Sequence, residues 1–160
     1  MFRIALGCVV GMLSAAPVFA QAAPAAAPAQ QPAAQANPFV FPGDGGVILN
    51  FVKADKTADF EMVLGKVKEA LAKSEKPERK QQATGWKIFK ASEPGPNGAV
   101  IYVFIMDPVV KGGDYSIGQI LVEGFGQAEG TTMYKTYSES FGTPAIGALL
   151  HLTQVVDLGK

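Results

Sequence analysis

Residues 99–106 (AVIYVFIM) decide the fold, because all eight are apolar or aromatic and none is charged. Side chains alternate between the two faces of a sheet, so such a run predicts a strand that is buried on both faces. Residues 46–53 (GVILNFVK) are similarly apolar on both alternating faces, except at Asn50. We therefore expect these two runs to be the central strands of a sheet.

The remaining elements follow from periodicity and from turn-forming residues. Apolar residues at spacings of three and four predict a helix that is N-capped by Thr57 and ends before Pro77. Dense turn chemistry between two β-rich runs predicts a hairpin, and Gly142–Gly147 separates the last helical piece from the last strand. The expected ranges are 86–92, 99–106 and 149–157 for the later strands, and 115–125 and 131–141 for two helical pieces.

This order predicts an α+β fold of the ferredoxin-like type, β-α-β-β-α-β, with an antiparallel four-stranded sheet and a second helix in two pieces. The expected strand order is 4-1-3-2, which places the two most apolar runs in the centre. Both helices of this fold cover one face of the sheet, so the other face should be polar. Here the central strands are apolar on both sides, and something must therefore cover the second face.

The N-terminus has the three-part layout of a secretory signal over residues 1–20. Arg3 gives a positive start, residues 4–16 are apolar and uncharged, and small or permissive residues precede Gln21. The apolar run is shorter than the ~20 residues of a membrane span. We expect a periplasmic or secreted protein with no integral membrane segment after cleavage; an uncleaved membrane anchor is the alternative.

Residues 21–42 are uncharged and rich in Ala, Pro and Gln, which predicts a disordered tether. The domain then comprises residues 43–160, which is enough chain for one core. These residues hold all 14 acidic and 13 of the 14 basic residues of the chain. Nucleic-acid-binding domains are normally strongly basic, so this near-neutral balance argues against that class of partner.

The residue inventory also limits the chemistry. The one cysteine, Cys8, lies in the predicted signal, so the mature domain has no disulfide and no thiol nucleophile. The one histidine, His151, offers little for a zinc site or a histidine relay. We expect no metal and no cofactor, and a binding domain rather than an enzyme.

The order of elements and the run Ala99–Met106 resemble the dimeric α/β-barrel group, which includes the antibiotic-biosynthesis-monooxygenase-like proteins. In that group two ferredoxin-like sheets pack through their open faces, so the resemblance implies a homodimer. The likeness covers about residues 47–157. Residues 51–90 (FVKADKTADFEMVLGKVKEALAKSEKPERKQQATGWKIFK) are also similar to small exported bacterial proteins of unknown role.

Some proteins of this group degrade haem with an Asn, a Trp and a His. Asn50 fits the Asn position, but Trp86 and His151 fall on the second and last predicted strands. The group's pattern places the Trp on the third strand and the His just beyond it. This departure argues against haem degradation and favours a packing role for Trp86 and a packing or interface role for His151.

We therefore expect a homodimer that forms through the open sheet face and binds a small apolar ligand there. The candidate ligand-binding residues are Asn50, Tyr102 and His151. The first alternative is an enzyme of the cofactor-free monooxygenase or haem-binding type. The second is an envelope interaction protein in which the tether matters most.

A glycine-rich stretch, Gly124-Phe125-Gly126-Gln127-Ala128-Glu129-Gly130, invites comparison with phosphate-binding loops. Its spacing is one residue longer than the dinucleotide fingerprint, and the acidic residue expected about 20 positions later has no good counterpart. We expect this stretch to be a loop between two helical pieces.

Overall fold

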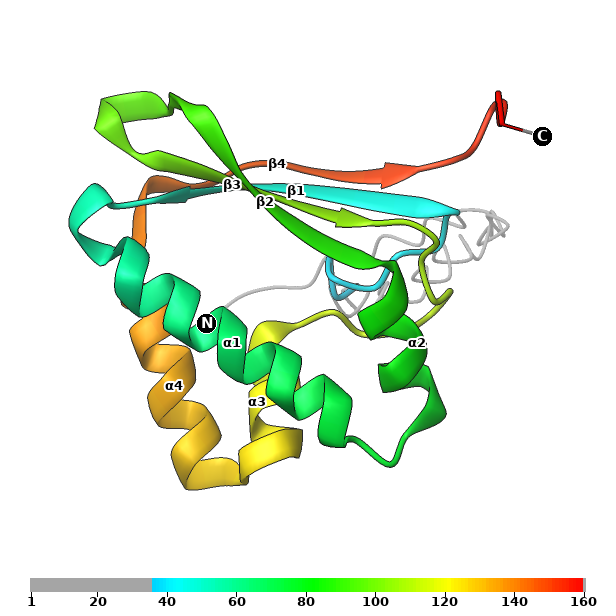
Figure 1. Ribbon diagram of the computed structural model, residues 1–160, viewed down its shortest axis with the longest axis horizontal. Coiled ribbons are helices and arrows are strands. Elements are labelled where there is room, and N and C mark those ends of the chain that lie inside the picture. The colour runs from blue at the N-terminus through cyan, green and yellow to red at the C-terminus, as the bar shows by residue number, and fades with distance from the viewer. Residues whose placement is uncertain (1–35, 160) are drawn as a thin grey trace, which may run out of the picture. The chain divides into compact units, whose positions relative to one another are not determined.

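A four-stranded sheet forms one layer of the domain, and four α-helices lie against one of its faces (Figure 1). The computed structural model describes residues 36–159, so the predictions for residues 1–35 lie outside the described residues. The strands are β1 (Gly45–Val52), β2 (Trp86–Pro94), β3 (Val100–Met106) and β4 (Phe141–Leu152). The helices are α1 (Thr57–Lys73), α2 (Pro77–Gly85), α3 (Ile117–Phe125) and α4 (Gln127–Glu139), with 3₁₀ turns η1 (Ala54–Lys56) and η2 (Pro96–Gly98).

The sheet order is β2-β3-β1-β4, and all neighbouring strands are antiparallel. The predicted order 4-1-3-2 is thereby confirmed, with the two apolar runs in the centre. Asn50 lies opposite Tyr102 in the register of β1 and β3, and both side chains are buried on the helix-covered face. Their strand neighbours, such as Leu49 and Val103, lie on the opposite face.

The element order differs from a strict β-α-β-β-α-β pattern, because the β1–β2 and β3–β4 connections each contain two α-helices, whereas β2 and β3 are joined by the 3₁₀ turn η2. The helix that was not predicted is α2, which follows α1 after a three-residue break. The first helix ends before Pro77 as expected, since α1 stops at Lys73, and Pro77 also begins α2 at the first helical position, where its missing N–H costs nothing. The sequence pattern predicted no element over residues 77–85, because this stretch is polar and has almost no apolar stripe.

The last strand begins earlier than expected. Residues 142–147, predicted as a break, belong to β4, where Phe141 pairs with Val52 and Ile146 pairs with Asn50. The glycines and the proline are tolerated because β4 is an edge strand and its pairing with β1 shifts register around Asn50. Pairing ends at Leu152, so the prediction that this strand runs to residue 157 was also wrong.

The prediction of a second helix in two pieces is confirmed by α3 and α4. Gly126 separates them with a φ of 82°, a backbone conformation that favours glycine. The predicted N-cap of the first helix was one residue too late. Lys56 is the N-cap of α1, and the Thr57 hydroxyl donates to the carbonyl of Ala54 in η1 (3.3 Å).

The segment before β1 packs into the domain. Phe41 is fully buried, and its ring lies edge-on to Tyr115 with centroids 5.5 Å apart. Val40 forms an isolated antiparallel bridge with Asp114. The packed part of the chain therefore begins before residue 43, within the C-terminal end of the predicted tether.

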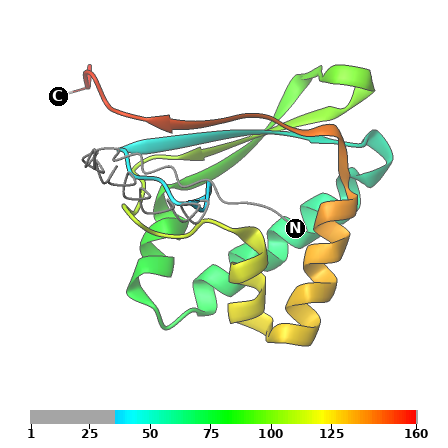
Figure 2. The same ribbon diagram turned by 180° about the vertical axis from the view of Figure 1, so that it is seen from behind.

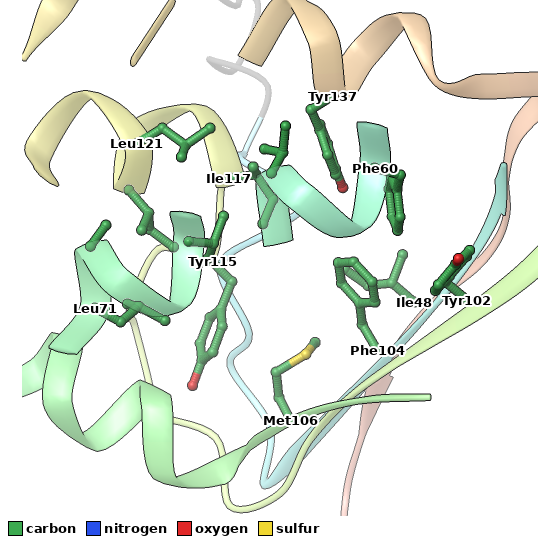
Figure 3. Packing of buried hydrophobic residues seen from close by; sticks show 14 of the residues in the cluster. Ile48, Phe60, Leu71, Tyr102, Phe104, Met106, Tyr115, Ile117, Leu121 and Tyr137 are labelled. Atoms are coloured by element: carbon green, nitrogen blue, oxygen red, sulfur yellow. The ribbon is translucent and has the colours of Figure 1, made fainter. Parts of the chain in front are cut away.

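Figure 2 shows the sheet and the helices as two layers, and the core side chains lie between them (Figure 3). Both the sheet and the helices contribute large side chains to the core. The ring centroid of Phe60, on α1, lies 4.7 Å from that of Tyr102 and 5.2 Å from that of Tyr137. The four helices occupy one side of the sheet only, and none of residues 36–159 forms a helix on the other side.

Candidate functional site

A cavity of about 900 Å³ lies between the sheet and the helix pair α3–α4. We call it the sheet–helix cavity. β1, β3 and β4 contribute Ile48, Asn50, Phe104 and Ile146, and the helices contribute Ile117 and Tyr137. This size is in the range of pockets that hold drug-sized molecules.

Asn50 is the most unusual residue in the wall of this cavity. Only 2% of its surface is exposed, and its Nδ2 has no hydrogen-bond partner among the described residues. It belongs to a central strand, at the point where the pairing of β1 with β4 shifts register. An unpaired buried amide costs about 1–3 kcal/mol, so its retention in an apolar wall needs an explanation.

Tyr137 enters the cavity wall from α4. Its ring stacks on Phe60, and its hydroxyl end points from α4 toward the interior of the domain (Figure 3). Burial raises the pKa of the Tyr137 hydroxyl far above its usual range, with a smaller contribution from Tyr134. The phenol therefore stays protonated at neutral pH and remains a hydrogen-bond donor.

The other lining residues are apolar, aromatic, or polar without charge. None of the described residues that line the cavity is charged. Tyr134 and Ile146, which are 45% and 38% exposed, place one side of the lining at the protein surface. A ligand could enter there without unfolding the core.

A second hollow, the α1–β2 groove, has a volume of about 610 Å³ and a different chemistry. The Tyr102 hydroxyl donates to Glu61 Oε1 (2.5 Å), and Lys90 Nζ donates to the same oxygen (3.0 Å). Hydrogen bonds from Tyr102 and Lys90 lower the pKa of Glu61, and burial raises the pKa of Tyr102. Glu61, Tyr102 and Lys90 are thus paired with one another, so this arrangement stabilises the α1–β2 contact.

Trp86 lines the same groove. Its ring packs edge-on against Phe104 (5.9 Å) and Tyr115 (5.2 Å), which agrees with the packing role expected for it. Its Nε1 is buried and has no partner among the described residues. The side chain as a whole is half-buried.

His151 lies elsewhere, at the end of β4. Its Nε2 is 3.1 Å from the carbonyl oxygen of Pro38, and its ring packs edge-on against Phe41 (5.0 Å). These contacts hold the segment before β1 against the sheet. His151 does not line the sheet–helix cavity or the α1–β2 groove.

The three predicted site residues therefore do not form one site. Asn50, Tyr102 and His151 all lie on the helix-covered side of the sheet, not on the open face where a ligand was expected. Asn50 lines the cavity, Tyr102 lines the groove, and His151 contacts the N-terminal segment. Sequence reasoning did not identify Tyr137 as a site residue, because only the tertiary arrangement of α4 and the sheet forms the cavity.

The open face is the third candidate surface. It carries apolar side chains from all four strands. They are Val47, Leu49, Phe51, Phe89, Ile101, Val103, Ile105 and Leu150. Phe89 and Leu150, on the two outer strands, are 51% and 49% exposed, and the central ones are half-buried by one another.

The described residues offer little for metal or haem chemistry. Residues 36–159 contain no group of three His, Cys, Asp or Glu side chains that could hold a metal ion. Asn50, Trp86 and His151 line three different places, so they do not form a common pocket. No helix in the described part of the chain is long and apolar enough to cross a membrane.

Comparisons of the chain with protein-family models, with curated proteins and with solved structures give no match. The resemblance to the dimeric α/β-barrel group therefore stays a prediction, and the functional argument rests on the geometry of the chain itself.

Proposed function

We propose that this protein is an exported binding domain that works as a homodimer, with the two sheets packed through their open faces. The observation that supports the proposal is the apolar open face defined above, which none of the described helices covers. The strand order β2-β3-β1-β4 supports a ferredoxin-like fold, with one additional helix in each of the β1–β2 and β3–β4 connections. Export is proposed from residues 1–20, as argued from the sequence.

The area of this face is sufficient for a specific interface. Four strands about 4.8 Å apart, with about seven residues each, cover roughly 450 Å² in projection. Contiguous apolar patches larger than a few hundred Å² usually mark interaction sites. A standard interface buries ~800 Å² of accessible surface per partner, and pleated side chains expose more surface than their projection.

A second copy is the occupant that fits best. Among the paired strand positions on this face within residues 36–159, Lys87 at the β2 edge is the one charged residue. Residues 21–35 contain no aromatic or long aliphatic side chain, so they could bury little apolar surface here. A second sheet offers the same apolar area and no unpaired charge at the centre.

The test is the association state of the purified protein and of a charge variant. Val103 pairs with both Leu49 and Phe89, so it lies at the centre of the face. We expect the wild type to sediment as a dimer at micromolar concentration and Val103→Lys to sediment as a monomer with an unchanged far-ultraviolet circular dichroism spectrum. Met62→Lys places the same charge on α1, at a 56% exposed position away from the sheet, and should remain dimeric.

Phe89→Lys provides a second variant should Val103→Lys fail to fold, because half of the Phe89 side chain is already exposed. A wild type that stays monomeric into the hundred-micromolar range would overturn the proposal. So would a Phe89→Lys or Val103→Lys protein that dimerises as tightly as the wild type.

A further inference from the structure

The sheet–helix cavity carries an inference that does not depend on dimerisation. It rests on the binding role proposed above and names the site and the ligand class. Its starting point is that Asn50 lines the cavity and that its Nδ2 is buried and has no partner among residues 36–159. Replacing Asn50 by an apolar residue would remove the cost of the unpaired donor, so the amide has no evident benefit for the empty protein.

The second donor faces the same space from the opposite layer. Asn50 belongs to β1 in the sheet, and Tyr137 belongs to α4. The Tyr137 ring is held between Phe60 (5.2 Å) and Phe141 (4.9 Å), so its hydroxyl has a fixed direction. Two positioned donors in an apolar wall match the usual design of a small-molecule site, in which a few polar groups orient the ligand.

The absence of charge determines the ligand class. A charged molecule would lose its hydration shell on entering the cavity. It would find no opposite charge there, because none of the described lining residues is charged at neutral pH. Aromatic side chains such as Phe39, Phe104 and Phe141 provide much of the wall. They favour an apolar ligand with a flat or aromatic part.

We propose that the sheet–helix cavity binds a neutral, largely apolar small molecule that carries an oxygen acceptor, such as a carbonyl, which accepts a hydrogen bond from Asn50 Nδ2. Tyr137 donates to a second acceptor where the ligand carries one. The open sheet face plays no part in this binding.

The test uses three probes with one shape, and binding to the purified protein is measured by ligand-observed nuclear magnetic resonance. Benzophenone is neutral and has a carbonyl, diphenylmethane lacks the carbonyl, and 4-benzoylbenzoate adds a carboxylate. We expect benzophenone to bind about 3- to 10-fold more tightly than diphenylmethane, the range of one neutral hydrogen bond. 4-Benzoylbenzoate should bind at least about 10-fold more weakly than benzophenone.

Variants assign the binding to this cavity. In Asn50→Leu the preference for benzophenone over diphenylmethane should disappear, while the thermal stability of the empty protein stays equal or rises. Thr131→Trp should block benzophenone binding because Thr131 lines the cavity and is exposed. Thr132→Trp is the matched control, because Thr132 is also exposed but does not line the cavity. The Thr132→Trp protein should bind benzophenone as the wild type does.

Each other outcome overturns the inference. Benzophenone binding that is absent in the wild type, or equal in Thr131→Trp, would refute the site. An Asn50→Leu protein that keeps the carbonyl preference would refute the role of Asn50, and tighter binding of 4-benzoylbenzoate would refute the neutral ligand class. Val103→Lys separates this inference from the proposed dimer, because it should abolish dimerisation and leave benzophenone binding unchanged.

Discussion

Asn50 and Tyr102 lie directly opposite each other on β1 and β3, but their polar ends serve different parts of the molecule. The Tyr102 hydroxyl is satisfied by Glu61 in the α1–β2 groove, whereas the Asn50 Nδ2 remains unpaired in the wall of the sheet–helix cavity. The same pair of central strands thus carries a satisfied polar contact in the α1–β2 groove and an unpaired amide at the sheet–helix cavity. This asymmetry separates the structural residue of the pair from the candidate functional one.

The packing of Phe41 over Gly46 gives the first prediction. A Cβ at Gly46 would overlap the Phe41 ring and approach Met106 Cε to 2.9 Å. Gly46→Ala should lower the free energy of unfolding by about 1–3 kcal/mol, the usual cost of overpacking a core. Urea unfolding measures this change.

Gly65→Ala is the control for that experiment, because a Cβ at this α1 position meets nothing within 4 Å. It should stabilise the protein by up to about 1 kcal/mol through helix propensity. In a Phe41→Ala background, the cost of Gly46→Ala should shrink, since the ring that it strikes is gone. An equal cost in both backgrounds would contradict the proposed contact.

The second prediction concerns the buried guanidinium of Arg79. Its Nε and Nη2 donate to the two carboxylate oxygens of Glu123 (3.0 and 2.9 Å), and Nη1 donates to Gln82 Oε1 (2.8 Å) and to the carbonyl of Asp114. This network ties α2 to α3. Glu123→Gln should lower the free energy of unfolding at neutral pH by about 1–3 kcal/mol, because it leaves a buried cation with one partner fewer.

The contribution of Glu123 to stability should depend on pH, and the pKa of Glu123 determines the direction of this dependence. The hydrogen bond from Arg79 lowers the pKa of Glu123 below its ordinary value of 4.5, and the contact from Lys76 acts in the same direction. The carboxylate therefore contributes stability above pH ~4.5, and this contribution is lost as the pH falls through the lower pKa of the folded state. The difference in the free energy of unfolding between the wild type and Glu123→Gln, measured by urea unfolding from pH 7 to pH 3, should become smaller as the pH falls. Glu93→Gln on exposed β2 is the control and should show no comparable gap.

The tyrosines give a third prediction, at alkaline pH. Burial raises the pKa values of Tyr102, Tyr115 and Tyr137, which are three of the four tyrosines in the chain. Raised values stabilise the fold below the unfolded pKa of ~10, and this stability is lost as the pH rises through the folded values. Phenolate absorbance should therefore appear at higher pH in the native protein than in urea. Coincident titration curves would contradict the burial of these hydroxyls.

The central part of this fold could be predicted because its signals are local. Residues 99–106 are apolar or aromatic without interruption, residues 46–53 are apolar except at Asn50 and the terminal Lys53, and the two runs form the central strands. Helix α2 was missed because its polar sequence is held by long-range bonds from Arg79 and Gln82, which no local pattern shows. The signal that could have identified it was Pro77 at a helix start followed by Glu78 in the first turn.

The candidate site was only partly predictable for a related reason. Asn50 was recognised as the polar interruption of an apolar strand, which is a local feature. The cavity that it lines depends on how α3 and α4 pack beside the start of β4, and Gly142–Gly147 suggested a break there rather than a strand. Tertiary pairing with β1 overrode that local preference.

The last prediction concerns the glycines at the α3–α4 junction, which pack against other helices. A Cβ at Gly124 would lie 2.5 Å from the Cβ of Ala70 on α1, and one at Gly130 would lie 2.6 Å from the Cα of Val122. Gly124→Ala should therefore lower the free energy of unfolding by about 1–3 kcal/mol. Ala70→Gly in the same chain should restore part of that loss, because it returns the space that the new methyl group occupies.

Inorganic phosphate should leave the melting temperature of the wild type unchanged. A rise in melting temperature with phosphate that Gly124→Ala abolishes would instead show that residues 124–130 bind an anion.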